Sequence, residues 1–236
     1  MLLSLQDFTI VTPIILLLTF YSSFKNGIPT CEKYLFNSCL YILSALCVFI
    51  SSVYYQRENQ LVPEDKLSMF ALGGLILSFV AIFTIFKTKN ILVKHLCLFY
   101  IIIFLGIVSD QFYEKFDQQL IDETLIRTSV LSAIALAIAI MFPHILKESF
   151  YTKLVCVFIF LVIAHFIDII FFQSSHKVTF SYIFILIFFT FIMYDSKFIM
   201  QRALTCKNNA DYVHGTLDIF LDLINLFQNL LVVGDN

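Results

Sequence analysis

The sequence predicts an all-α integral membrane protein, built as a seven-helix transmembrane bundle with an extra N-terminal hydrophobic segment. Of its 236 residues, 60% are hydrophobic and only 14% are charged, whereas a soluble domain carries about 25% charged residues. The mean hydropathy is +0.90. The apolar residues stand in continuous runs, whereas the strands of a membrane β-barrel alternate apolar and polar residues. The runs are joined by short connections, so we expect residues 1–236 to form a single transmembrane domain.

Seven apolar segments are long enough to cross a bilayer, which takes about 20 helical residues. A further apolar segment, residues 8–24, is shorter and has Pro13 near its start. It lacks the basic leader and the small-residue cleavage site of a signal peptide. This segment either spans the membrane, which we favour, or lies at its interface. The seven predicted spans are 34–56, 67–86, 91–109, 124–142, 153–172, 178–200 and 212–233.

Lysine and arginine are distributed unevenly between the two sides of these spans. The side from which the first span enters receives ten of them, and the opposite side receives five. Because cytoplasmic loops are enriched in these residues, we expect the richer side to face the cytosol or a mitochondrial matrix. If residues 8–24 also span, the N-terminus lies on the other side. The ten cations are Lys25, Lys33, Lys87, Lys89, Lys94, Lys147, Lys153, Lys197, Arg202 and Lys207.

The motif content argues against an enzyme. The six cysteines show no CxxC spacing and no pairing with histidine at metal-ligand spacing, so we expect them to act as small hydrophobic residues rather than in disulfides or metal sites. There is no Gly-rich phosphate loop and no nucleophile elbow. We therefore expect no catalytic residues, no cofactor and no nucleic-acid partner.

Two aspartates near the C-terminus fall at matching positions of a predicted helical hairpin. If the two helices join at 207–209, Asp195 lies 12 residues before Lys207 and Asp222 lies 13 residues after Asn209. At 1.5 Å per helical residue, both lie roughly 18–20 Å from the turn. The sequence therefore predicts that the two carboxyl groups reach similar depth on neighbouring antiparallel helices.

Two carboxylates close together in a low-dielectric site cannot both ionise cheaply and should titrate as a unit. Such a pair suits a proton switch or a Ca²⁺ site, because calcium prefers several oxygen ligands that Asn225 or water could complete. The alternative is a shared-proton hydrogen bond that only clamps the two helices together. Helical spacing also aligns further polar residues of the last segment on one face: Asp211, His214, Asp218, Asp222 and Asn225.

Weaker candidates lie elsewhere in the chain. Asp110, Glu114 and Asp117 could form an acidic rim that concentrates cations at an outer mouth, or simply a solvated face. His165 and Asp168, three residues apart in one span, suit a proton or transport role, unless Asp168 lies near the headgroups. His214 could add pH sensitivity near neutrality, or be an ordinary hydrogen-bonded interface residue.

The C-terminal motif resembles the signature of the transmembrane Bax-inhibitor-motif (Bax inhibitor-1) family, across residues 194–227. The resemblance rests on Tyr194 and Asp195, the fixed gap that follows, and the ending Leu-Asp-Leu-Ile-Asn-Leu-Phe at 221–227. It implies seven helices and a pH-sensing latch made by Asp195 and Asp222. It also implies a basic residue after the second helix that contributes to the latch, for which Lys87 or Lys89 is the nearest match. The sequence departs from the family in its third helix, where Gly106 is the only glycine.

Members of that family are described as pH-sensitive Ca²⁺ leak channels and suppressors of cell death. The resemblance therefore implies the same function here, in the endoplasmic reticulum or another endomembrane, with lipid and Ca²⁺ as partners. The alternative hypothesis is a structural subunit of a larger membrane complex, for instance in the mitochondrial inner membrane. In that case Arg127, an unusual charge for the fourth helix, and the acidic rim would contact partner proteins.

Overall fold

The computed structural model describes residues 5–172, 175–207 and 210–236, with residues 5–9, 64 and 65 described by their backbone alone. In this part of the chain the fold is all-helical, apart from a two-stranded hairpin of β1 (Phe24–Lys25) and β2 (Ile28–Pro29). Seven of the described helices are long and apolar enough to cross a membrane, which confirms the predicted fold class. The helices are α1 (Leu5–Ser23), α2 (Tyr34–Asn59), α3 (Glu64–Lys87), α4 (Ile91–Tyr113), α5 (Gln118–Met141), α6 (Glu148–Phe172), α7 (Lys177–Thr205) and α8 (Tyr212–Gly234).

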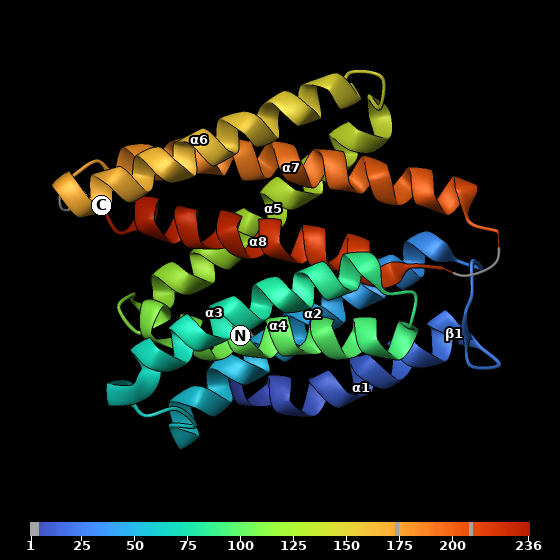
Figure 1. Ribbon diagram of the computed structural model, residues 1–236, viewed down its shortest axis with the longest axis horizontal. Helices are drawn as coiled ribbons and strands as arrows, with labels where there is room; N and C mark the ends of the chain where they lie inside the picture. The colour runs from blue at the N-terminus through green and yellow to red at the C-terminus, as the bar shows by residue number, and fades with distance from the viewer. Residues whose placement is uncertain (1–4, 173–174, 208–209) are drawn as a thin grey trace. The chain divides into compact units, whose positions relative to one another are not determined.

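The chain divides into two compact units. Unit 1 contains Met1–Lys115 and Arg202–Phe220, and unit 2 contains Phe116–Gln201 and Leu221–Asn236. The last helix, α8, therefore gives its first half to unit 1 and its second half to unit 2. The colours of Figure 1 locate the segments of each unit along the chain.

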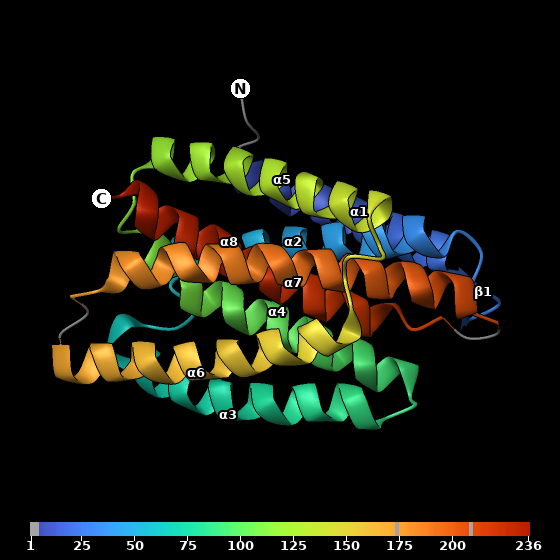
Figure 2. The ribbon, with the colours of Figure 1, turned by 90° about the horizontal axis from the view of Figure 1, so that it is seen from above.

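In unit 1, α1 packs along α2 through a ladder of polar contacts (Figures 1 and 2). The Thr12 hydroxyl lies 2.9 Å from that of Ser51, and the Thr19 hydroxyl lies 2.7 Å from that of Ser44. As the residue number rises on α1 it falls on α2, so the two helices are antiparallel. Hydrogen bonds between helices are a main source of association where lipid removes the hydrophobic driving force. At 19 residues, α1 is about 28 Å long, close to the roughly 30 Å of a bilayer core.

The contact between α2 and α4 depends on Gly106. A Cβ atom at this position would lie 2.6 Å from Cβ of Ser52 and 2.8 Å from the backbone oxygen of Phe49. The backbone oxygen cannot turn aside as a flexible side chain can, so the two helices approach this closely only because residue 106 lacks a side chain.

Gly106→Ala should therefore destabilise the folded protein, by about 1–3 kcal/mol, because it overpacks the interface between α2 and α4. Gly73→Ala is the matched control: no atom lies within 4 Å of its added Cβ, and alanine favours a helix by about 1 kcal/mol over glycine. Denaturant unfolding in detergent measures both variants. Equal stability changes for the two variants would contradict the close α2–α4 contact.

One prediction about the cysteines is wrong. Cys31, in the connection between α1 and α2, forms a disulfide with Cys206, which follows α7, and their Cα atoms lie 5.7 Å apart. The two residues are 175 positions apart in sequence, so spacing along the chain gave no signal for the pair. The other four cysteines are free thiols: Cys39, Cys47, Cys97 and Cys156.

The core of unit 2 is built around α7. Phe184, Phe188 and Phe191 recur along one face of this helix and are buried, together with Ala135 of α5 and Leu226 of α8. Phe158 of α6 packs edge-on against the same face, with its ring centroid 5.5 Å from that of Phe188 and 5.6 Å from that of Phe191. These aromatic contacts hold α6 on α7, and Leu226 adds the α8 segment of unit 2 to the same buried cluster.

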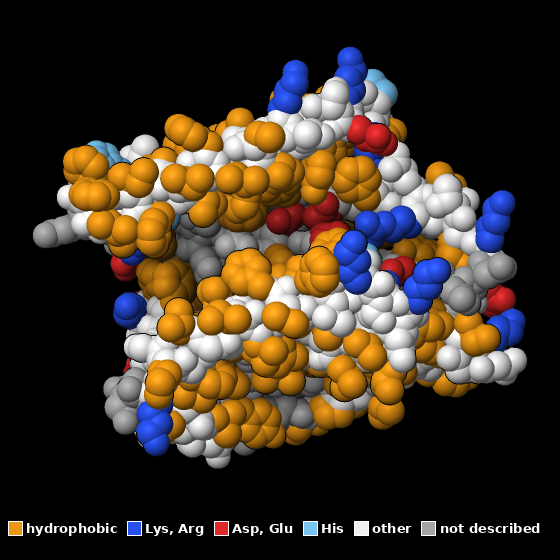
Figure 3. Space-filling view, in the orientation of Figure 1, with side chains coloured by type: hydrophobic (Ala, Val, Ile, Leu, Met, Phe, Trp, Pro, Cys, Tyr) orange, Lys and Arg blue, Asp and Glu red, His pale blue; other side chains and the backbone are white. Residues whose placement is uncertain are grey.

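Each unit also keeps a wide apolar surface. On α3 the Met69 side chain is 75% exposed, and on α6 that of Phe160 is 70% exposed. Figure 3 shows hydrophobic side chains over both helices. Apolar area of this extent suits contact with lipid tails, as expected of an integral membrane protein.

Candidate functional site

Asp195 and Asp222 are both buried within unit 2. Asp195 lies on α7 and is 7% exposed, and Asp222 lies on α8 and is 8% exposed. Charged side chains are rarely this buried unless they are paired or neutralised. The burial fits the predicted proton-sharing or cation-binding pair, whose direct contact stays a prediction.

The packing of α7 and α8 supports similar depth for the two carboxyl groups. Leu226 of α8 belongs to the same buried cluster as Phe191 and Ile192 of α7, and the two helices run antiparallel in a hairpin (Figures 1 and 2). One helical turn toward the connection leads from Phe191 to Asp195 on α7 and from Leu226 to Asp222 on α8. This arrangement fits the predicted similar depth of the two carboxyl groups, which stays a prediction.

The segment of α7 that carries Asp195 is anchored on both sides. The Tyr194 hydroxyl donates a hydrogen bond to the backbone oxygen of Lys147 at 3.0 Å. The Lys197 ammonium donates to the backbone oxygen of Leu146. Both acceptors lie in the connection between α5 and α6, so Asp195 sits on a firmly held stretch of helix.

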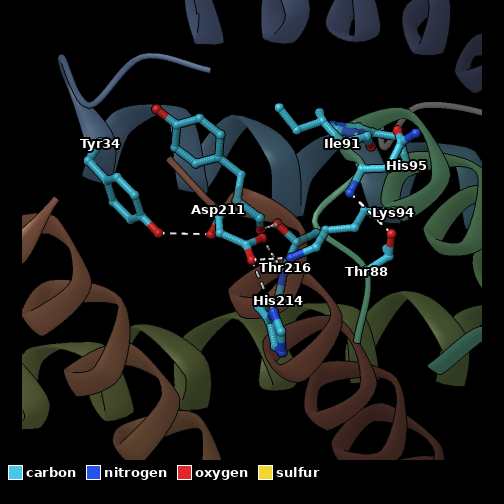
Figure 4. A network of polar contacts seen from close by, with 10 residues as sticks. Tyr34, Thr88, Ile91, Lys94, His95, Asp211, His214 and Thr216 are labelled. Carbon is cyan, nitrogen blue, oxygen red and sulfur yellow. Dashed lines mark hydrogen bonds and ion pairs between the residues drawn. The ribbon is translucent and has the colours of Figure 1, made fainter. Parts of the chain in front are cut away.

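A second polar cluster surrounds the start of α8 in unit 1 (Figure 4). The Lys94 ammonium lies 2.5 Å from a carboxylate oxygen of Asp211. The imidazole Nδ1 of His214 lies 3.2 Å from the same oxygen, and the His214 ring contacts the Phe86 ring at a centroid distance of 4.3 Å. The Tyr34 hydroxyl donates to the backbone oxygen of Asp211 at 2.9 Å. The cluster thereby joins α2, α3 and α4 to the first turn of α8.

The Asp211 carboxyl lies just outside α8 and is held in its charged form. Burial acts to raise its pKa, but hydrogen bonds from His214 and Lys94, with the charge of Lys94, outweigh burial and hold the pKa of Asp211 well below its ordinary value. The carboxylate therefore stays ionised across the physiological range.

The stabilisation from ionised Asp211 should be fully present above about pH 5 and be lost as the pH falls below about 4, because the folded-state pKa is depressed below the unfolded value of about 3.9. Asp211→Asn should cost about 1 kcal/mol, a figure reduced for the 39% exposure of this side chain. Unfolding of both proteins in a His214→Gln background at several pH values measures the difference. A stability difference between the two proteins that disappears between pH 6 and 8 would contradict a charged Asp211 carboxylate.

The other polar residues predicted on one face of the last helix are Asp218 and Asn225. Asp218 is half-buried and lies within electrostatic reach of Arg202 and His214. The Asn225 amide donates to the backbone oxygen of Leu221 at 2.7 Å, within its own helix. Asn225 therefore keeps only its side-chain oxygen for a cation.

Lys87 and Lys89 are both exposed at the end of α3, and the Lys87 ammonium lies 5.7 Å from the centroid of the Phe83 ring. The lysine that forms an ion pair beside the start of α8 is instead Lys94, which binds Asp211 and for which the sequence predicts no role in the latch. The available signal was its position in the first turn of an apolar span, where a charge is costly and needs a partner. A latch role for Lys87 or Lys89 stays a prediction.

The predicted acidic rim loses one member. Asp110 is 8% exposed, and its carboxylate accepts a hydrogen bond from Arg57 Nε at 3.0 Å, so it forms a partly buried ion pair between α2 and α4. The partner lies 53 residues away, and this distance in sequence hid the pair. Glu114 and Asp117 are exposed, as a solvated face requires.

Asp168 has a different partner from the one expected. It is 4% exposed, and one carboxylate oxygen lies 2.7 Å from Nδ1 of His176. His165 instead packs against the rings of Phe180 and Phe184, with centroid distances of 4.9 and 5.8 Å. Asp168 and His176 also line a shallow, mostly apolar cavity of about 290 Å³ between α6 and α7. The pair joins the ends of these two helices.

Two further observations concern the structural-subunit hypothesis and the calcium site. Arg127 forms an exposed ion pair with Glu123, one turn away on α5, at 3.1 Å, so its charge has a partner within the chain. Among the described residues, no group of three or more His, Cys, Asp or Glu side chains could hold a metal ion. A calcium role for Asp195 and Asp222 would thus rest on two carboxylates with water or amide oxygens.

Comparison with known proteins covers nearly the whole chain. Residues 9–233 match the family model described as "Inhibitor of apoptosis-promoting Bax1". A search of curated proteins found no match. The match includes every predicted span and the hairpin that carries Asp195 and Asp222. The chain is an integral membrane protein that belongs to the Bax inhibitor-1 family.

Proposed function

We propose that this protein is a pH-sensitive Ca²⁺ leak channel, in which Asp195 and Asp222 form the latch. The single observation that carries the proposal is the burial of both carboxyl groups, at 7% and 8% exposure, on the two helices of one hairpin. Buried ionisable groups within membrane spans are costly and mark ion or proton pathways by default. The family assignment adds that the chain is one of a group of membrane proteins that are generally not enzymes.

The latch would work through the charge state of the carboxyl pair. When the two groups share one proton, a hydrogen bond joins α7 to α8 and closes the path. When both ionise, repulsion at about 4 Å amounts to roughly 4 kcal/mol at an effective dielectric constant of 20, and the helices separate. A divalent cation passing between the ionised groups would offset that repulsion. Flux should therefore fall as the pH falls.

We also propose a role in cell death, which the family description supports, and a location in an endomembrane. A channel that lowers the stored calcium of an internal membrane would act on ion homeostasis and, through it, on cell death. Mitochondrial membranes are the alternative location.

Reconstitution tests the channel proposal. The purified full-length protein in liposomes loaded with a calcium indicator should admit Ca²⁺ above the rate of empty liposomes, and faster at pH 8 than at pH 6. The alternative, a structural subunit, draws on the exposed apolar faces of α3 and α6, which a partner could cover in place of lipid. A chain that conducts nothing alone and migrates only in a stoichiometric assembly would overturn the channel and favour the subunit.

A further inference from the structure

The Cys31–Cys206 disulfide lies where several hydrogen bonds fasten the start of α8 to the α1–α2 connection, all within unit 1. The backbone N–H of Ala210 donates to the Pro29 oxygen at 3.3 Å. The Tyr212 hydroxyl donates to the Thr30 oxygen and accepts from the Asn37 amide, the latter at 3.1 Å. The disulfide is the one covalent bond in this set, and it closes the α7–α8 connection onto the α1–α2 connection.

The disulfide lies at the cation-rich end of unit 1. The contacts of Asp211 with Lys94 and of His214 with Phe86 bring the start of α4 and the end of α3 to this end as well. The opposite end of the unit carries only Arg57, Lys66 and Lys115 among its described cations. Seven cations gather at the disulfide end: Lys25, Lys33, Lys87, Lys89, Lys94, Arg202 and Lys207.

This position conflicts with a permanent disulfide. The cation-rich side of a membrane protein faces the cytosol or matrix, where thiols are kept reduced and disulfides are mostly transient or redox-sensing. Both cysteines are half-buried rather than enclosed, so a thiol reagent can reach them.

We propose that Cys31 and Cys206 are a reversible redox site that controls how firmly α8 is held. In the reducing direction, the thiolate of a cellular thiol attacks one sulfur, forms a mixed disulfide and displaces the other cysteine as a thiolate. A second thiol resolves the mixed disulfide. The net exchange converts the protein disulfide and two cellular thiols into two protein thiols and one disulfide between the cellular thiols. Two electrons and two protons pass to the protein.

Reduction removes the covalent bond at the start of α8 and leaves its hydrogen bonds, the Lys94–Asp211 ion pair and the ring contacts of Tyr212 and His214. The same helix carries Asp222, so a looser α8 would change the latch. This consequence rests on the proposed channel function, whereas the redox site itself does not.

The first experiment tests the redox site separately from its effect on the latch. A variant with the four free cysteines replaced (Cys39→Ser, Cys47→Ala, Cys97→Ala, Cys156→Ser) keeps only the pair. In liposomes it is equilibrated with glutathione buffers of graded ratio and labelled with a membrane-impermeant maleimide. Two thiols should appear together at the glutathione ratios of these buffers, and they should be labelled from the side of the lysine-rich loops. A bridge that survives excess reduced glutathione, or labelling from the opposite side, would overturn the redox site.

Two further readouts use the wild-type protein and Cys31→Ser/Cys206→Ser. On reduction, hydrogen exchange of residues 212–216 in the wild type should rise about tenfold, to the level of the variant, while that of residues 66–75, at the other end of α3, is unchanged. Calcium flux should change on reduction in the wild type and not in the variant. Flux that ignores reduction, with exchange responding, would overturn the control of the latch. No flux in either protein, with the thiol and exchange results as expected, would overturn the channel and leave the redox site in place.

Discussion

Asp222→Asn should lower calcium flux at pH 8 about fivefold or more and remove its dependence on pH. The asparagine amide can donate a hydrogen bond to the Asp195 carboxylate without needing a shared proton, so the variant mimics the closed pair at every pH. A coupling of 1–3 kcal/mol between two states corresponds to roughly a 5–150-fold change, and the effect expected here lies at the lower end.

Asp222→Ala should act in the opposite direction. Alanine cannot bond to Asp195, so nothing closes the latch and flux should equal or exceed that of the wild type at acid pH. Asp235→Asn, at the exposed end of the chain, is the control for an aspartate change of the same chemistry and should match the wild type. Two Asp222 variants that both lose flux would indicate structural damage rather than a latch, and unchanged flux in both would exclude it.

Cys31→Ser should destabilise the oxidised protein by about 2–4 kcal/mol, because the disulfide restricts the unfolded chain across 175 residues. Denaturant unfolding in detergent without reductant measures the loss. A reductant should lower the stability of the wild type to that of the variant and leave the variant unchanged. Cys39→Ser, at an exposed free thiol, should stay within about 0.5 kcal/mol of the wild type. Equal stability of Cys31→Ser and oxidised wild type would contradict the disulfide.

The seven spans were predictable because each is a continuous apolar run of the length that a bilayer requires. The starts of two helices were less so. α5 begins at Gln118 and α6 at Glu148, whereas the spans predicted from the apolar runs begin at 124 and 153. The first turns of both helices are polar, and hydropathy does not register a helix that continues beyond the hydrocarbon core.

Similar depth for Asp195 and Asp222 is predicted by helix geometry, because a hairpin with equal arms fixes which residues face each other, and it stays a prediction. The pairs that close over long distances could not be predicted in this way. Lys94 with Asp211, Arg57 with Asp110, and Cys31 with Cys206 depend on how separate helices pack. Asp168 with His176 was missed for a related reason: His176 lies beyond the end of α6, and helical spacing pointed to His165 instead.

The distance between the Asp195 and Asp222 carboxyl groups, in an experimental structure determined at pH 6 and again at pH 8, tests the latch most directly. At pH 6 the closest oxygens should lie within hydrogen-bond distance, about 2.5–3.0 Å, and at pH 8 they should lie farther apart or hold a cation between them. Carboxyl groups more than about 6 Å apart at both pH values, with no bridging group, would be too distant to share a proton and would contradict the latch.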